Sequence, residues 1–373
     1  MNFEYTDEQQ QLADSVRKYL ANAYDFEKRK AIVRSDTGVS DAVWATFAEL
    51  GLTALALPEA DGGFGGGAVD LMAPLEACGE ALVVEPLIET IGLGARLVAR
   101  AGSAAQRETL LRGVAEGSVR LAFASLEPKR RYSLDPQATT ARAADGGWVL
   151  DGEKTVVIGA PAASHLIVSA RTAAGASLFV VDPRAAGVRL SPCRTVDGQR
   201  AADVFLTGVR LPADALLGAD GAALPVIEEA VDFATALLCA DAVGAMKHAI
   251  DATLEYTKNR KQFGVPISSF QVLQHRMVEM YISCEQARSM AILAATRVDG
   301  GAADAAERQR AVSMAKVKIA DVARLISQES VQLHGGMGMT EEMKVSHTFR
   351  RLTMIAQRFG DADHHLERYA ALS

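Results

Sequence analysis

The sequence lacks the features that mark secreted, membrane-spanning and nucleic-acid-binding proteins. The N-terminus has no basic and apolar leader, and no run reaches the roughly 18 apolar residues of a membrane span. The net charge of -7 gives no electrostatic reason to bind nucleic acid. The 373 residues include four widely spaced cysteines and no CxxC pair, so we expect a cytoplasmic protein with reduced thiols. These cysteines are Cys78, Cys193, Cys239 and Cys284.

The histidines and methionines do not predict a metal site. His364 and His365 are adjacent and therefore point in different directions on a helix, whereas helical metal sites place ligands three or four residues apart. Met277 and Met280 belong to an apolar helical stripe, where methionine usually fills gaps in a core. We therefore expect no metal.

The order of hydrophobic patterns predicts an α+β protein in three parts. Residues 1–118 have helical periodicity, beginning after the good N-cap Thr6 and interrupted by the glycine-rich loop PEADGGFGGG. Residues 119–222 contain short runs such as HLIVSAR and SLFVVD, which are typical of a β domain. Residues 223–373 return to long helical patterns. One stripe in this last part follows helical spacing: Leu273, Met277, Met280, Cys284, Ala287 and Ala291.

Two segments of the last part carry specific motifs. Arg-Lys-Gln-Phe-Gly at 260–264 is followed by Phe270 and Gln271, and Gln-Leu-His-Gly-Gly-Met-Gly at 332–338 is followed by Thr-Glu-Glu. Together with the PEADGGFGG loop, Leu-Glu-Pro at 126–128 and the order of the parts, they resemble the acyl-CoA dehydrogenase family over essentially the full chain. The resemblance implies an N-terminal helical domain, a middle β-barrel-like domain and a C-terminal four-helix bundle. The stretch RRLTMIAQRFGDADHHLERYA resembles small subunits of pimeloyl-CoA dehydrogenases, which oxidise dicarboxylyl-CoA.

The resemblance also implies an FAD cofactor. A guanidinium matches phosphate oxygens with a rigid fork of donors, so Arg260 suits the FAD pyrophosphate. Glycines let a backbone approach the ligand closely. In the family these segments hold the ADP half of an FAD whose ring lies in the neighbouring subunit, commonly within a dimer of dimers. The implied cofactor-binding residues are Arg260, Phe263, Gln271, Gln332, Gly335 and Gly336.

The family reaction needs a carboxylate that this chain lacks at both expected positions. Family members remove the α-hydrogen of an acyl-CoA as a proton while the β-hydrogen leaves as hydride to the flavin, and the electrons pass to an electron-transfer flavoprotein. Most members take the carboxylate from an IYEGT-like stretch, where this chain has Phe359. A minority take it from the helix that begins the last domain, where this chain has Ala234. Neither side chain can accept a proton.

The positions that contact the flavin ring depart from the family as well. The hydroxyl before Glu-Pro is replaced by Leu126, and the tryptophan and threonine of the next strand are replaced by Val156 and Ile158. The glycine-rich stretch after Pro128 is replaced by the cationic cluster Lys129 to Arg131, which is either a solvated loop or an anion site. The residues expected to bind the FAD pyrophosphate are therefore present, whereas those expected to contact the flavin ring are replaced.

Three hypotheses follow from this contrast. The preferred one is a subunit without a base in a heteromeric acyl-CoA dehydrogenase, whose second subunit holds the flavin ring, base and thioester. The second is a complete homomeric enzyme with a relocated base, for which Asp361 and Asp241 are the candidates. The third is a flavin-free protein that uses the fold for acyl-CoA binding or assembly. A flavin enzyme of another reaction, such as a nitroalkane oxidase or monooxygenase, also remains open.

Overall fold

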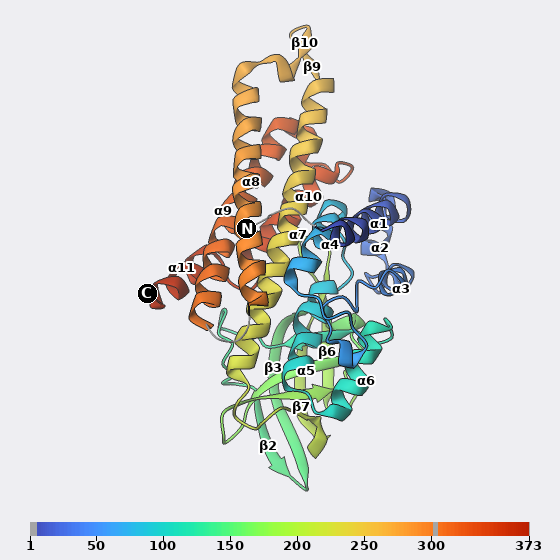
Figure 1. Cartoon of the computed structure of the whole chain (residues 1–373), viewed down its shortest axis with the longest axis vertical. Helices are drawn as coiled ribbons and strands as arrows, with labels where there is room; N and C mark the ends of the chain where they lie inside the picture. Colours follow the sequence, from blue (N-terminus) through green and yellow to red (C-terminus); the bar gives the residue numbers. More distant parts are fainter. Residues whose placement is uncertain (1–5, 301–304, 373) are drawn as a thin grey trace. The chain divides into compact units, whose positions relative to one another are not determined.

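The chain forms two compact units, each built from separate stretches of sequence (Figure 1). The computed structural model describes residues 6–300 and 305–372. The helical unit comprises Met1–Lys30, Ala68–Val83 and Thr235–Ser373. The sheet unit comprises Ala31–Gly67 and Val84–Ala234. The first 118 residues are thus divided between the two units.

Long helices make up most of the helical unit. A short hairpin, β9 (Lys261–Gln262) with β10 (Val265–Pro266), connects the long helices α7 and α8 (Figure 1). The first residues of α7 belong to the sheet unit, and α2 (Phe26–Arg34) crosses from one unit to the other. The remaining helices are α1 (Asp7–Ala23), α4 (Ala68–Ala81), α7 (Leu224–Asn259), α8 (Gln271–Asp299), α9 (Ala305–His334), α10 (Lys344–Gln357) and α11 (Ala362–Ala371).

The helices begin and pack as the sequence pattern predicts. Thr6 caps α1 through a reciprocal pair of hydrogen bonds with Gln9, so two otherwise unpaired backbone donors are satisfied. The predicted stripe of α8 is buried at four of its six residues, whereas Leu273 and Met277 are half-buried. The buried residues are Met280, Cys284, Ala287 and Ala291. In the described part of the chain, no helix has both the length and the apolar character needed to cross a bilayer.

Contacts distant in sequence hold α4 within the helical unit. The Asp299 carboxylate accepts hydrogen bonds from the N–H groups of Ala68 and Val69, at 2.7 and 2.9 Å, and so caps the beginning of α4. A Cβ added to Gly244 would lie 1.9 Å from the carbonyl oxygen of Glu76, so α7 and α4 touch backbone to backbone. The N-terminal helix α4 therefore depends on residues near positions 244 and 299.

The sheet unit contains an eight-stranded sheet in the order β6-β7-β3-β2-β4-β5-β8, with β1 paired to β4. The long antiparallel pair of β3 and β7 has register shifts after Leu150 and after Lys154, which mark bulges. The strands are β1 (Leu121–Ala124), β2 (Thr140–Ala144), β3 (Gly147–Ile158), β4 (His165–Arg171), β5 (Ala176–Val181), β6 (Val188–Arg194), β7 (Arg200–Pro212) and β8 (Leu216–Leu217). The helices are α3 (Asp41–Glu49), α5 (Ala95–Ala101) and α6 (Ala104–Ala115).

A π-helical segment, Ile88–Gly94, runs directly into α5 and is buried throughout. Thr90 in this segment contacts the backbone of Leu121, with its hydroxyl 3.2 Å from the carbonyl oxygen. The segment thereby fixes the start of β1, which leads into the loop of the Leu-Glu-Pro motif. Hydrophobic periodicity does not distinguish this geometry from an ordinary buried helix.

Candidate functional site

The predicted pyrophosphate residues gather at one end of the helical unit. Arg260 directly follows α7, and its backbone N–H donates to the carbonyl of Tyr256 at 2.8 Å. Its guanidinium is exposed and forms no ion pair with any described residue. Tyr256 stacks on His334 with ring centroids 4.4 Å apart. Because His334 immediately precedes Gly335, this contact places the end of α7 beside the glycine turn that follows α9.

Two of the three glycines in that turn are required by the fold of the chain, and the third is not. Gly335 has φ +59°, a left-handed conformation that favours glycine. At Gly338 an added Cβ would lie 2.8 Å from the carbonyl oxygen of Val331, so packing excludes a side chain. Gly336 is not left-handed, and an added Cβ there would meet nothing within 4 Å. A glycine that the chain itself does not require leaves bare backbone for a close-fitting ligand.

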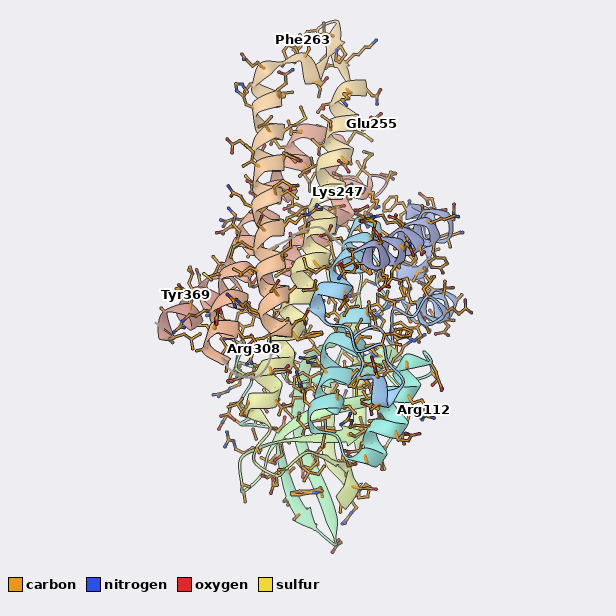
Figure 2. The ribbon with its side chains drawn as sticks, in the orientation of Figure 1. Arg112, Lys247, Glu255, Phe263, Arg308 and Tyr369 are labelled. Atoms are coloured by element: carbon orange, nitrogen blue, oxygen red, sulfur yellow. The ribbon has the colours of Figure 1, made fainter. Side chains whose placement is uncertain are left out.

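The hairpin between α7 and α8 projects an apolar tip. Phe263 is 91% exposed and meets the ring of Phe270 edge-on at 6.1 Å, and Figure 2 shows it at the far end of the hairpin. Gln271, the first residue of α8, and Gln332, in the last turn of α9, both have exposed side chains. Apolar exposure of this extent is typical of a protein–protein contact. Further exposed apolar residues here are Val265, Val272, Val278, Tyr281 and Ile282.

Phe359, at the expected position of the base, lies in a strained turn between α10 and α11. Its φ is +58°, which an aromatic residue rarely adopts. The guanidinium of Arg358 lies 4.8 Å from the centre of the Phe359 ring. The buried His365 donates from Nε2 to the Phe359 carbonyl at 3.0 Å. Burial and then Lys316 lower the pKa of His365 to about 3, so this histidine is neutral near pH 7. This turn therefore presents an aromatic ring with a cation beside it.

Lys316 holds the same turn from α9. Its ammonium group donates to the carbonyls of Ala356 and Gly360, at 3.1 and 2.7 Å, and so satisfies the C-terminal end of α10. The side chain is fully buried, and burial lowers its pKa to about 8. No motif singles out Lys316 in the sequence; its only signal is a lysine at an apolar position of a helical pattern.

The two candidate relocated bases have other partners. Asp361 caps α11, with its carboxylate accepting from the His364 N–H at 2.9 Å. Asp241 is buried on α7 and forms an ion pair with Arg351, whose Nε and Nη2 lie 3.0 and 2.9 Å away. Ala234, the other expected base position, is buried in α7.

The predicted ring-contacting positions of the sheet unit carry aliphatic side chains on a constrained backbone. Val156 is 43% exposed and has φ +48°, a marked outlier for a β-branched residue. The Asp203 carboxylate accepts from the Val156 N–H at 2.9 Å and from the Thr155 hydroxyl at 2.9 Å, which fixes this conformation. Leu126 and Ile158 are half-buried and, like Val156, offer no side-chain hydrogen bond.

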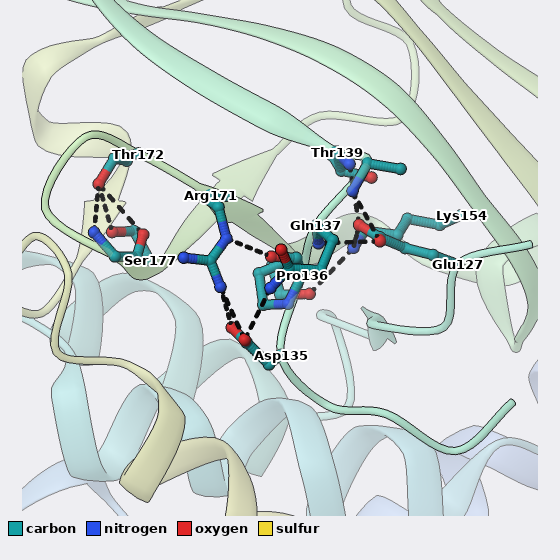
Figure 3. A network of polar contacts seen from close by, with 12 residues as sticks. Glu127, Asp135, Pro136, Gln137, Thr139, Lys154, Arg171, Thr172 and Ser177 are labelled. Carbon is teal, nitrogen blue, oxygen red and sulfur yellow. Dashed lines mark hydrogen bonds and ion pairs between the residues drawn. The ribbon is translucent and has the colours of Figure 1, made fainter. Parts of the chain in front are cut away.

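A buried ion pair anchors the loop that follows the Leu-Glu-Pro motif (Figure 3). Glu127 accepts from three successive backbone N–H groups at residues 137–139, at 2.9, 2.9 and 2.8 Å, and from Lys154 at 3.1 Å. Burial alone would raise the pKa of Glu127, but these donors outweigh it and lower the pKa to about 2. Burial lowers the pKa of Lys154 to about 8. The loop therefore begins and ends at one fixed carboxylate.

Comparison with known proteins identifies the family. Models of the N-terminal, middle and C-terminal domains of acyl-CoA dehydrogenase match residues 6–118, 122–209 and 222–371. The chain is 32% identical over 368 residues to the acyl-CoA dehydrogenase FadE12 of Mycobacterium tuberculosis, covering 95% of this chain and 93% of that protein. The chain belongs to the acyl-CoA dehydrogenase family.

Two further acyl-CoA dehydrogenases are similar over nearly the whole chain. A probable acyl-CoA dehydrogenase of Bacillus subtilis, YngJ, is 30% identical over 94% of this chain and 93% of its own length. A variant of the Tcur3481-Tcur3483 steroid ACAD has 30% identity and a TM-score of 0.88, covering 98% of this chain and 97% of that one. The predicted family, its α+β fold and its FAD dependence are confirmed. The enzymes of this family are oxidoreductases acting on the CH–CH group of acyl-CoA.

The residues present fit the two halves of FAD unequally. The exposed Arg260 guanidinium and the bare backbone at Gly336 suit a pyrophosphate, and Gln271 and Gln332 add exposed amide groups. The side chains at 126, 156 and 158 contribute no donor or acceptor to a flavin ring. FAD supplies the hydride acceptor in this family when it is bound. This chain's residues suit its phosphate end.

Proposed function

We propose that this chain is the subunit without a base in a heteromeric acyl-CoA dehydrogenase. It contributes Arg260, Gln271, Gln332 and the Gly335–Gly336 backbone to an FAD, with Phe263 at the contact between subunits. The flavin ring, the carboxylate base and the thioester are held by a second acyl-CoA dehydrogenase chain. Phe359 and Ala234 occupy the two positions where family members carry the base, so the base is supplied by the partner chain.

The contrast between the two halves of the cofactor site carries this proposal. Two of the pyrophosphate residues have no role inside the described chain: Arg260 has no described ion-pair partner, and Gly336 has no conformational or packing need to be glycine. The carboxylates near the base position are occupied, Asp241 by Arg351 and Asp361 by the start of α11. Retention of one half of a site with loss of the other is expected when a site is shared between different chains.

Several finer features belong to the same proposal. The acyl-CoA substrate is a medium-chain dicarboxylyl-CoA, by resemblance of the stretch around Phe359, although the similar Tcur3481-Tcur3483 protein is a steroid ACAD. Electrons leave to an electron-transfer flavoprotein. The assembly is a dimer of dimers in the cytoplasm, in which the exposed apolar tip around Phe263 contacts the partner chain.

Flavin content tests the subunit role directly. The chain is purified alone and after co-expression with a neighbouring acyl-CoA dehydrogenase gene, and FAD per chain is measured by absorbance. We expect little or no FAD alone and about half an FAD per chain in the complex. One FAD per chain, with turnover of an acyl-CoA by the chain alone, would reject the proposal.

A matched pair of variants assigns the phosphate contact. Arg260→Gln in the complex is expected to lower FAD content strongly, because a neutral amide cannot replace the guanidinium fork on phosphate. Lys258→Gln removes a similarly exposed positive charge two residues away and is expected to leave FAD content unchanged. Equal FAD content in both variants would exclude Arg260 as the clamp.

The competing homomeric enzyme is tested by Asp361→Asn. Asparagine caps a helix as well as aspartate does, so α11 is preserved while the carboxylate is removed. Turnover unchanged by this substitution excludes Asp361 as a base. Loss of turnover in a chain that retains its stability and its FAD would favour the homomeric enzyme.

A further inference from the structure

The loop after β1 contains two consecutive tight turns with cations at glycine-like positions. The turn 127–130 is closed by the Arg130 N–H donating to the Glu127 carbonyl at 3.1 Å, and the turn 130–133 is closed in the same way at 3.1 Å. Lys129 has φ +64° in the first turn, and Arg131 has φ +48° in the second. Turn positions with positive φ are ordinarily filled by glycine or asparagine. Here both carry a long cationic side chain.

The cations of this loop have no partners in the described chain. Lys129, Arg130 and Arg131 are exposed, and none of them forms an ion pair with a described residue. The backbone N–H groups of Lys129 and Arg131 likewise lack an acceptor there. Alternation of left-handed and other residues turns such N–H groups toward an anion. Many other arginines of the sheet unit are paired with acids: Arg96, Arg107, Arg120, Arg171, Arg184 and Arg210.

The loop is held at both ends by the network of Figure 3. Glu127 fixes its beginning to the backbone at residues 137–139 and to Lys154. Near the end of the loop, Arg171 forms an ion pair with Asp135, in which Nη2 lies 2.6 and 2.7 Å from the two carboxylate oxygens. Its Nε donates to the Pro136 carbonyl at 2.8 Å. A loop fixed in this way loses little conformational freedom when it binds a ligand. The three cations are therefore presented on a preorganised backbone.

We propose that Lys129, Arg130 and Arg131 bind the phosphate groups of a nucleotide polyanion, and that this polyanion is the phosphorylated end of coenzyme A. The inference goes beyond the proposed subunit role and does not depend on where the thioester reacts. It rests on the acyl-CoA family of the chain only for the identity of the nucleotide.

The exposure of the three side chains favours phosphates over a single carboxylate. One exposed ion pair with a carboxylate changes affinity by at most about fivefold. The adenosine 3′-phosphate and pyrophosphate of coenzyme A offer several charges, and phosphate oxygens match guanidinium donors in geometry. A carboxylate at the end of an acyl chain would instead call for a buried cation, whereas these three lie in solvent.

Calorimetric titration of the chain in its purified complex tests the site. The probes are coenzyme A, dephospho-coenzyme A, ADP and pimelate, each at about 50 and 200 mM salt. We expect coenzyme A to bind most tightly, dephospho-coenzyme A more weakly, pimelate least, and the nucleotide affinities to fall with salt. Equal affinity for coenzyme A and ADP would reject coenzyme A as the source of the phosphates. Absence of nucleotide binding would overturn the site itself.

Glycine substitutions separate the charge from the loop conformation. The double variant Lys129→Gly and Arg131→Gly relieves both left-handed backbones, so it folds at least as well while lowering the coenzyme A affinity about tenfold. The double variant Lys129→Arg and Arg131→Lys retains both charges and is expected to bind within about twofold of the original. Unchanged affinity in the glycine variant would overturn the proposal.

A charge-matched control excludes a general electrostatic effect. Lys18, Arg142 and Arg194 are exposed and have no ion-pair partner among the described residues. Changing two of them, Lys18 and Arg194, to glutamine removes two positive charges away from the loop, as many as the glycine variant removes, and is expected to leave the affinity unchanged. A loss as large as that of the glycine variant would also overturn the proposal. Flavin content does not enter these measurements, so the subunit role can fail while the phosphate site stands.

Discussion

The turn after α9 and the loop after β1 both require left-handed backbone, and they meet that requirement in opposite ways. In the first, Gly335 takes the left-handed position and Gly336 leaves the neighbouring backbone bare. In the second, Lys129 and Arg131 take the left-handed positions despite a strain of about 1–2 kcal/mol for each L-residue. The first turn thus offers backbone to a ligand, and the second offers charge. Positive φ alone therefore does not reveal a ligand, and the side chain placed there shows which chemistry is available.

The largest expected effect comes from removing the anchor of the second region. Lys154→Met leaves the Glu127 carboxylate buried without its counter-ion and is expected to lower the free energy of unfolding by about 3 kcal/mol. Urea unfolding measures this loss. Arg210→Gln breaks an exposed ion pair with Asp145 in the same unit and is expected to cost less than about 1 kcal/mol. Similar losses in the two variants would mean that the buried pair does not anchor the loop.

The turn between α10 and α11 is a third turn with a left-handed residue, Phe359, and the buried Lys316 holds this turn. The pKa of Lys316 is about 8 in the folded chain against 10.5 when exposed. Between these values the unfolded chain binds more protons, so this lysine makes stability rise with pH. Relative to Lys316→Met, the original protein should gain on the order of 2 kcal/mol from pH 7.5 to 10.

Urea unfolding at several pH values measures this gain. Lys258→Met changes an exposed lysine and serves as the control, for which we expect no such pH-dependent difference. A difference between the original protein and Lys316→Met that stays constant from pH 7.5 to 10 would contradict the burial of a charged lysine at this turn.

The two glycines of the first turn should separate conformation from ligand contact. Gly335→Ala forces a side chain into left-handed backbone and is expected to cost about 1 kcal/mol of stability. Gly336→Ala is expected to change stability by less than about 0.5 kcal/mol, since the added Cβ meets open space, yet to lower FAD content in the complex. Thermal unfolding and flavin absorbance measure the two effects. Normal FAD content in Gly336→Ala would show that this backbone does not face the cofactor.

The smallest expected effect is at Val156, where strain accompanies an aliphatic side chain. Val156→Gly releases a left-handed β-branched residue but adds unfolded-state entropy, so we expect a net stabilisation of about 0.5 kcal/mol. Its exposed side chain contributes little burial that could offset this gain. A destabilisation of 1 kcal/mol or more, measured by thermal unfolding, would mean that the side chain packs against a partner.

The sequence predicts what depends on local periodicity and on whole motifs. The buried stripe of α8, ending at Ala291, follows directly from helical spacing, and the family follows from motifs such as that at 260–264. The base positions Phe359 and Ala234 and the phosphate residues around Arg260 stay predictions. Their assignment depends on the resemblance and on a partner chain.

Other features lie beyond sequence reasoning for physical reasons. The contact between Glu127 and Lys154 spans 27 residues and depends on how the strands pair. The left-handed conformation of Lys129 and Arg131 contradicts the local preferences of both residues. The capping of α10 by Lys316 depends on the packing of α9 against the following turn.

The divided sequence of the helical unit has a consequence for the order of events during protein synthesis. Residues Ala31–Gly67 and Val84–Ala234 complete the sheet unit before most of the helical unit has been translated. At about 5–20 residues per second, α4 waits about 10–45 seconds for Asp299, which caps its first turn. Until then α4 can pack against α1, which precedes it in the same unit, but not against α7 or α8. The face of α4 that later meets α7 and α8 is therefore a surface that a nascent-chain chaperone has reason to cover.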